Sequence, residues 1–226
     1  LRPRLPMPNA RRSTRRGRSL RRLPWPLLLS GALLAVLVAW AAWRTADPLR
    51  VFAGTSLEER IALLREPIRS AAAEAGIDPY LLAGLVATES SGRPRARSSV
   101  GALGLTQLRP DTAAEQARLM KLPVPDEGDL LGDPELNLRL GAGYLARLIK
   151  RQGGSIPQAL MAYNTGPTRF NRWLNEAGGY EAWLAKRQRE GKPKPGSVLH
   201  YAQKVQEWAR RLEQRRRLEA PEPAPR

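Results

Sequence analysis

Glu89 stands where an ionisable acid ends an apolar run, a setting in which a carboxyl group can serve as a proton donor. Leu82, Leu85 and Val86 precede it at helical spacing, so Glu89 continues their apolar stripe. Gly92 ends the predicted helix soon afterwards, which places the carboxyl near the negative end of the helix dipole. Burial and the dipole both disfavour the carboxylate, so we expect the raised pKa that a general acid requires. From position alone, the alternative is a helix-terminal glutamate that turns into water.

Further motifs follow Glu89 at wide intervals, and they favour the general acid over the glutamate that turns into water. The sequence reads ESSGRPRARSSVGALGLTQL from Glu89, then AYNTGP at 162–167, and Tyr201 falls in a late helical pattern. Several motifs in order are far more specific than any one of them. From Arg65 to Glu207 the chain resembles the soluble lytic transglycosylase family, whose catalytic domain is all-α with a goose-type-lysozyme-like fold. The resemblance implies that Glu89 is the catalytic acid and that Tyr201 hydrogen-bonds its carboxyl.

The resemblance also implies a set of residues that contact the sugar. They are a serine beside the acid, a second serine close to the acid and the sugar, the glutamine of the second motif and two residues of the third motif: Ser90, Ser98, Gln107, Tyr163 and Asn164. The residue types alone leave simpler roles open for three of them. Ser90 can be a local partner of the backbone, Tyr163 a core aromatic, and Asn164 a cap at a helix end.

Thr106 and Thr165 depart from the family pattern. Thr106 stands where methionine is usual, which predicts the loss of a flexible apolar contact to the sugar. Thr165 replaces a usual alanine. Neither change removes a proton donor, so the catalytic interpretation of Glu89 is unaffected.

For the activity, the resemblance implies cleavage of the β-1,4 bond between N-acetylmuramic acid and N-acetylglucosamine in peptidoglycan. Glu89 would first protonate the leaving oxygen and then act as a base on the muramyl C6 hydroxyl, which closes a 1,6-anhydro ring. Neither a metal nor a cofactor is implied. Two alternatives stay open: a hydrolytic lysozyme of the same fold, and a catalytically weak peptidoglycan-binding scaffold of an envelope machine.

The elements that must position these residues are predicted to be helices, because no segment alternates steadily between apolar and polar residues. Ser56 is expected to cap a helix that Pro67 kinks or divides and that Gly76 ends. The other predicted signals are Asp78-Pro79 before the helix of Glu89, Asp133-Pro134 before a helix that ends at Gly153-Gly154, a capping box of Ser155 with Gln158, and a last helix over 198–217.

The composition argues against several classes of site. The chain has no cysteine, which excludes disulfides, thiolate metal sites and a cysteine nucleophile. Its single histidine, His200, argues against a histidine-rich metal site or a Ser-His-Asp triad. Of the formal charge of +17, residues 1–50 supply +10, from 11 Arg and one Asp. Since most of the excess lies ahead of the folded region, we expect no nucleic-acid partner.

Residues 23–43 carry no charge over 21 positions, a length that spans roughly 30 Å as a helix. Trp25 stands before the apolar core of this run, and Trp40 and Trp43 follow it, as in the aromatic belts of membrane spans. We favour an uncleaved transmembrane anchor. The alternative is a signal sequence that is cleaved near Ala41.

The uncharged segment at 23–43 divides the chain into the remaining predicted parts. Residues 1–22 are predicted to be a basic, disordered cytoplasmic segment, 44–55 a linker, 56–212 the catalytic domain and 213–226 a charged, Pro-rich tail. We expect a protein of the bacterial cell envelope, anchored in the membrane with its catalytic domain in the periplasm. With a cleaved signal it would instead be secreted to the periplasm. Its expected partners are glycan strands and the membrane.

Overall fold

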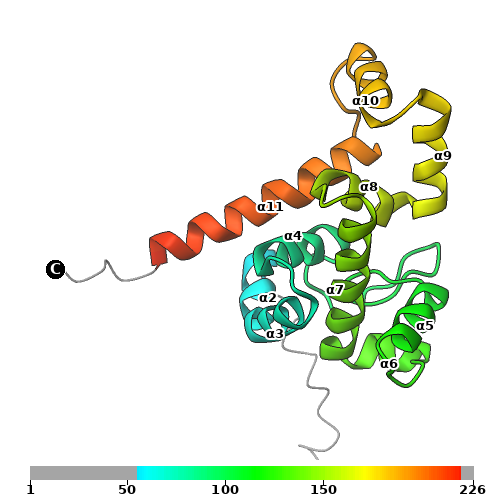
Figure 1. Ribbon diagram of the computed structural model, residues 1–226. Coiled ribbons are helices and arrows are strands. Elements are labelled where there is room, and N and C mark those ends of the chain that lie inside the picture. The colour runs from blue at the N-terminus through cyan, green and yellow to red at the C-terminus, as the bar shows by residue number, and fades with distance from the viewer. Residues whose placement is uncertain (1–54, 220–226) are drawn as a thin grey trace, which may run out of the picture. The chain divides into compact units, whose positions relative to one another are not determined.

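The computed structural model describes residues 55–219 of the 226-residue chain, and the regular structure in that range is helical (Figure 1). The helices are α2 (Leu57–Leu63), α3 (Arg65–Ala75), α4 (Pro79–Glu89), α5 (Pro110–Leu119), α6 (Glu127–Gly132), α7 (Pro134–Arg151), α8 (Ile156–Thr165), α9 (Pro167–Ala177), α10 (Tyr180–Arg189) and α11 (Val198–Glu219). In the described range, extended backbone pairs only at isolated bridges around Leu103. The predicted all-α class is confirmed.

Several predicted segments lie outside the described residues, namely 1–22, 23–43, nearly all of the 44–55 linker and the end of the tail. Among the helices between residues 55 and 219, none is both long and apolar enough to cross a membrane. At the other end, α11 continues to Glu219, so the boundary predicted at 212 falls inside a helix.

Most predicted helix ends are confirmed by their capping contacts. Ser56 and Glu59 form a reciprocal capping box at α2. The side chain of Asp78 accepts from the backbone N–H of Tyr80 at 2.8 Å and begins α4. Asp133 accepts in the same way from the N–H of Leu136 at 2.9 Å and begins α7. Each carboxylate satisfies a backbone N–H that has no partner within its helix.

The capping box predicted for Ser155 and Gln158 is wrong. Ser155 does precede α8, but its side chain makes no capping hydrogen bond. Pro157 occupies the second helical position and has no N–H, so one of the two donors that a cap side chain can reach is missing. The helix therefore begins from its proline and not from a side-chain cap.

The predicted division of the first helix is confirmed, with the break at Leu64 between α2 and α3. Pro67 lies in the first turn of α3, where a missing N–H costs little. Within a continuous helix its ring would clash with the carbonyl of Leu63, four residues earlier, and Leu63 is where α2 ends. Gly76 then ends α3 in the left-handed conformation, with a φ of 67°.

Helix α4 lies at the centre of the packing, since all seven residues from Leu81 to Ala87 are buried. Helix α11 crosses α4 at Gly84 and then extends beyond the other helices (Figure 1). A Cβ atom at Gly84 would lie 2.4 Å from the backbone carbonyl oxygen of Val205 on α11. The absence of a side chain at Gly84 therefore sets how closely α4 and α11 approach.

Asn137 on α7 anchors the loop that follows α4. The fully buried amide of Asn137 accepts from the N–H of Thr106 at 2.9 Å and from its hydroxyl at 2.7 Å. It also donates to the carbonyl oxygens of Leu103 and Leu130, each at 3.1 Å. Gly104 has a φ of 76°, and a Cβ there would lie 2.1 Å from the Asn137 amide nitrogen. The loop is thus held against α7 by a polar network whose partners are all satisfied.

Candidate active site

Glu89 and Tyr201 meet although 112 residues separate them in the sequence. Glu89 is the last residue of α4 and is partly buried. Tyr201 lies near the start of α11, and its phenol donates a hydrogen bond to Oε1 of Glu89. The crossing of α4 and α11 therefore brings together the two residues that the resemblance implies are catalytic.

The surroundings of Glu89 make it a carboxyl that can hold a proton near neutral pH. Burial is the largest influence and raises the pKa of Glu89 from its ordinary value of 4.5 to about 7. The hydrogen bond from Tyr201 and the charge of Lys204 act in the opposite direction, because both favour the carboxylate. The expected direction of the shift is therefore confirmed, with burial as its main cause. A group that is half-protonated near pH 7 can serve as an acid and then as a base.

Tyr163 places a second, partly buried phenol beside this pair. Its hydroxyl donates to the backbone carbonyl oxygen of Thr106 at 2.8 Å, and its ring lies 5.1 Å from that of Tyr144, between centroids. Burial, followed by the charge of Glu89, raises the pKa of both Tyr163 and Tyr201 well above the ordinary value of 10.0. Both phenols are therefore neutral hydrogen-bond donors at every pH at which Glu89 titrates.

The two predicted serines have local partners. The hydroxyl of Ser90 is buried and donates to the carbonyl oxygen of Val86 at 3.1 Å. The hydroxyl oxygen of Ser98 accepts from the N–H of Ala102 at 2.9 Å and so fixes the turn between them. Their contacts to a sugar remain predictions, and Ser90 occupies the local backbone role that its residue type allows.

Gln107 and Asn164 differ in how far they are already engaged. The side-chain nitrogen of Gln107 donates to the carbonyl oxygens of Ala96 and Gly104 at 3.1 and 2.9 Å, and its φ is 49°. These two bonds engage both hydrogens of the side-chain amide, so a side-chain contact of Gln107 with a sugar would use its oxygen. Asn164 is exposed in the last turn of α8, ahead of Gly166. As with the serines, the sugar contacts of these two residues are predictions.

The surroundings of Thr106 explain why threonine fits a position at which the family usually has methionine. Its side chain is fully buried against α7, where a Cβ at Gly141 would approach it to 2.5 Å. Its hydroxyl is bonded to Asn137. Position 106 thus anchors the loop, while the carbonyl of the same residue holds Tyr163.

Asn137 and Arg60 support the site and are absent from the sequence prediction. Arg60 on α2 is 7% exposed, and its Nε donates to the carbonyl oxygen of Ser91 at 2.7 Å. Ser91 follows Glu89 by two residues and has a φ of 53°, so Arg60 holds a left-handed turn next to the acid. Both side chains continue apolar helix faces, the same signal that identifies Glu89.

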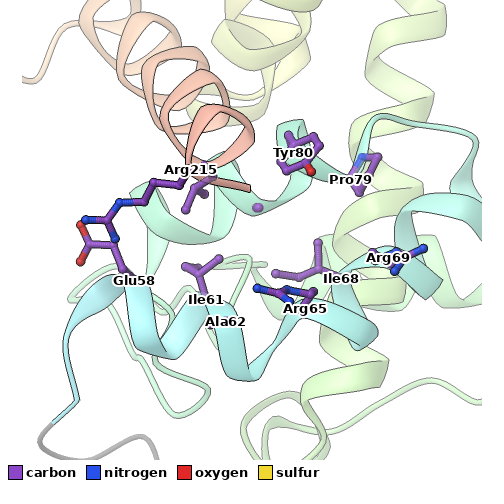
Figure 2. Close-up of a pocket in the computed structure, with 11 residues that line it drawn as sticks. Glu58, Ile61, Ala62, Arg65, Ile68, Arg69, Pro79, Tyr80 and Arg215 are labelled. Carbon is purple, nitrogen blue, oxygen red and sulfur yellow. The ribbon is translucent and has the colours of Figure 1, made fainter. Parts of the chain in front are cut away.

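A separate pocket lies at the opposite end of α4 (Figure 2). It has a volume of about 140 Å³ and is formed by α2, α3, α4 and α11, with Arg65, Arg69 and Arg215 around an apolar floor. Pro79 and Tyr80, which line it, begin the helix that Glu89 ends. Ten residues of helix separate Pro79 from Glu89, roughly 15 Å, so this pocket is not part of the acid's surroundings.

The model of the Transglycosylase SLT domain family matches residues 66–186, more than half of the chain. This chain belongs to the SLT family. The soluble lytic murein transglycosylase of Escherichia coli K12 is 35% identical over 91 residues, which cover 40% of this chain and 14% of that protein. A transglycosylase of the phage PRD1 is 42% identical over 121 residues, covering 54% of this chain and 41% of the phage protein. The chain therefore spans less than half the length of these curated relatives.

The SLT architecture is also found among solved structures. A lytic transglycosylase Slt of Pseudomonas aeruginosa, solved as an inactive Glu-to-Gln mutant, superposes with a TM-score of 0.57 at 32% identity. The match covers 70% of this chain and 25% of that one. The predicted lysozyme-like SLT fold is thus confirmed for the described residues.

The SLT segment contains six of the seven predicted site residues but not Tyr201, which lies on α11 beyond residue 186. Arg60, which holds the turn after the acid, lies ahead of residue 66. In this SLT-family chain, helices on both sides of the matched segment therefore complete the surroundings of Glu89.

Tyr201→Phe should raise the pKa of Glu89 further above its ordinary range. The substitution keeps the ring but removes a hydrogen bond that favours the carboxylate. A carbon-detected NMR titration of the Glu89 carboxyl measures the shift directly. Tyr163→Phe is the matched control, because its phenol donates to the Thr106 carbonyl and not to Glu89. An unchanged or lowered Glu89 pKa in Tyr201→Phe would contradict the role of this bond.

Proposed function

We propose that this chain is a peptidoglycan lytic transglycosylase that cleaves the β-1,4 bond between N-acetylmuramic acid and N-acetylglucosamine with formation of 1,6-anhydro-N-acetylmuramic acid. The observation that carries the proposal is the pairing of Glu89, a carboxyl with a pKa of about 7, with the phenol of Tyr201 in an SLT-family fold. The names of the curated relatives, lytic murein transglycosylase and transglycosylase, support it.

In the first step, protonated Glu89 gives its proton to the glycosidic oxygen. The bond from that oxygen to C1 of the muramyl ring breaks, and N-acetylglucosamine leaves with a free C4 hydroxyl. The substrate's own N-acetyl group stabilises the positive charge at C1, as in other substrate-assisted glycosidases. Tyr201 stabilises the carboxylate that Glu89 becomes, because its phenol donates to Oε1.

In the second step, the Glu89 carboxylate takes the proton of the muramyl C6 hydroxyl while O6 bonds to C1. The ring closes, Glu89 returns to its protonated form, and no water is consumed. The C6 hydroxyl is tethered to the reacting ring, so it competes with water at a high effective concentration. One carboxyl group thus serves both steps without a metal or a cofactor.

The surroundings of Glu89 favour this tethered nucleophile over water. A hydrolytic glycosidase usually needs a second carboxylate about 5–10 Å from the first. The sequence from Ser90 to Leu108, which follows Glu89, contains no second carboxylate. Glu115 on α5 and Glu127 on α6 are exposed and paired with Arg147 and Arg97.

Digestion of purified glycan strands in ¹⁸O-water separates the two reactions. We expect products that end in 1,6-anhydro-N-acetylmuramic acid, lighter by one water than lysozyme products and free of label at the new termini. Mass spectrometry reads both properties from one digest. Labelled reducing ends would identify a lysozyme, and binding of the strands without cleavage would identify a scaffold.

We also propose that the SLT domain works in the cell envelope outside the cytoplasm, anchored by residues 23–43 or secreted after cleavage of that segment. The support is the uncharged 21-residue run with its flanking tryptophans and preceding arginines. Washing membranes with alkaline carbonate distinguishes the two, because an anchored chain stays with the membrane fraction. A soluble product cut near Ala41 would indicate a signal sequence.

A further inference from the structure

Arg60 is a buried cation whose hydrogen bonds go only to the backbone. It lies on α2 and is 7% exposed. Its Nε donates to the carbonyl oxygen of Ser91 at 2.7 Å, and its Nη1 donates to the carbonyl oxygen of Thr55. No ion pair between residues 55 and 219 includes Arg60. Burial of a charge costs free energy, so these two carbonyls supply the compensation that a carboxylate usually gives.

The turn that Arg60 contacts begins directly after Glu89. Ser91 has a φ of 53° and Gly92 a φ of 70°, so two left-handed residues in succession carry the chain out of α4. The left-handed conformation is unfavourable for serine, because its Cβ approaches the following carbonyl oxygen. A Cβ at Gly92 would lie 2.9 Å from the Cβ of Arg60. Arg60 therefore holds this turn by close packing as well as by its hydrogen bond.

The conformation of this turn matters for Glu89, because the last turn of a helix frays easily. Glu89 is the final residue of α4, and the N–H of Ser90 still donates to the Val86 carbonyl at 3.1 Å. If the chain beyond Ser90 changes its course, this end of the helix opens and Glu89 moves with it. Glu89 then loses both its burial and its hydrogen bond from Tyr201. The position of the carboxyl therefore depends on a turn that Arg60 holds.

Helix α2 lies ahead of residues 66–186, the segment that the SLT family model matches, so family membership assigns no role to Arg60. Arg60 joins the backbone at Thr55, ahead of α2, to the backbone at Ser91, after α4. One side chain thus links the segment that enters the SLT domain to the turn that follows its acid.

We propose that Arg60 is a positioning residue for the acid: its guanidinium fixes the turn at Ser91 and so keeps the Glu89 carboxyl shielded from water and against Tyr201. The effect on cleavage rests on the proposed function. Arg60 makes no hydrogen bond or ion pair with Glu89, so it acts through the backbone of the turn. Its removal changes the surroundings of the acid without removing a group that takes part in proton transfer.

Arg60→Met in the full chain tests this, because methionine keeps an unbranched apolar stem and removes both hydrogen bonds. We expect the pKa of Glu89 to fall from about 7 towards 4.5, since burial is the largest influence on it. Loss of a nearby cation would by itself raise a carboxyl pKa, so a fall cannot come from the missing charge. A carbon-detected NMR titration of the Glu89 carboxyl measures this shift.

The rate of cleavage gives a second measurement. On soluble glycan strands we expect Arg60→Met to lower kcat by about 10- to 100-fold, the order of loss that a misplacement of roughly 1 Å produces, with little change in KM. Arg60→Lys should recover part of both effects, because an ammonium can still donate to one of the two carbonyls. If Arg60→Met does not fold, Arg60→Lys carries the comparison, with smaller shifts in the same directions.

Arg139→Met is the matched control. Arg139 joins α7 to α3 through two hydrogen bonds to Glu74, each 2.7 Å long, and none of its bonds goes to the turn at Ser91. This variant should keep the wild-type kcat and the wild-type Glu89 pKa. An unchanged or raised Glu89 pKa in the Arg60 variants, or a wild-type kcat, would make Arg60 a purely structural residue and overturn the inference. If the wild-type chain does not cleave glycan strands, the proposed function fails, and the NMR comparison still decides the role of Arg60.

Discussion

Glu89→Gln should reduce cleavage of purified peptidoglycan by at least ~10²–10⁴-fold, the usual contribution of general acid–base catalysis. The loss should lie at the upper end or beyond, because the same carboxyl donates a proton in one step and accepts one in the next. Glutamine is nearly isosteric and can still accept the Tyr201 hydrogen bond. The measurement is the rate of release of soluble muropeptides, at matched protein concentration and verified folding.

Glu135→Gln is the matched control, because Glu135 is an exposed glutamate in the first turn of α7. That variant should retain the wild-type rate. Activity of Glu89→Gln within a few-fold of wild type would show that another group supplies the proton.

Glu89→Gln should also stabilise the fold at alkaline pH, relative to the wild type. Burial raises the pKa of Glu89 from 4.5 to about 7. As pH rises through that window the unfolded chain releases the proton first, so wild-type stability falls. At about 1.4 kcal/mol per pKa unit, the ionised carboxyl costs the folded state about 3 kcal/mol above pH 7. Glutamine does not ionise, so urea unfolding should show a difference that is absent below pH 4.5 and complete above pH 7.

Asn137→Ala should lower the free energy of unfolding by about 3–5 kcal/mol. The substitution leaves the buried N–H of Thr106 and the carbonyl of Leu130 without their Asn137 partner, and it opens a cavity beneath Gly104. Activity should fall as well, because the Thr106 carbonyl holds Tyr163. Urea unfolding measures the loss.

Asn175→Ala is the control, because Asn175 is at an exposed position on α9. It should change stability by less than about 0.5 kcal/mol. A loss below about 1 kcal/mol at Asn137 would mean that the loop is held by other contacts.

Glu89 and the helix caps could be predicted from the sequence because their signals are local. An acid in an apolar stripe, or Asp before Pro at a helix start, is complete within one or two turns of chain. Tyr201 is different. Its contact with Glu89 depends on how α11 crosses α4, and no local pattern specifies a pairing over 112 residues. Only the resemblance pointed to this residue.

The structural features that the sequence prediction missed differ in how strong their local signals are. Helix α9 has an apolar stripe at helical spacing, Phe170, Trp173, Leu174 and Ala177, so its signal was present in the sequence. Helix α10 buries only Trp183 and has a much weaker stripe.

Arg60 and Asn137 do stand on apolar helix faces, but their hydrogen-bond partners are distant in the sequence. Ser91 is 31 residues from Arg60, and Thr106 and Leu103 are 31 and 34 residues from Asn137. A polar residue on an apolar helix face indicates that its side chain needs hydrogen-bond partners, but it does not indicate where in the sequence those partners lie.

The close crossing of α4 and α11 at Gly84 has a consequence for the order in which the protein becomes active. A ribosome makes Glu89 long before it makes Tyr201, and α11 cannot dock on α4 until nearly the whole SLT domain has been synthesised. A growing or truncated chain that ends before residue 198 has the acid without the tyrosine that holds it. An incomplete copy therefore lacks the Glu89–Tyr201 pair, and under the proposed function its activity would begin only when the last helix is complete.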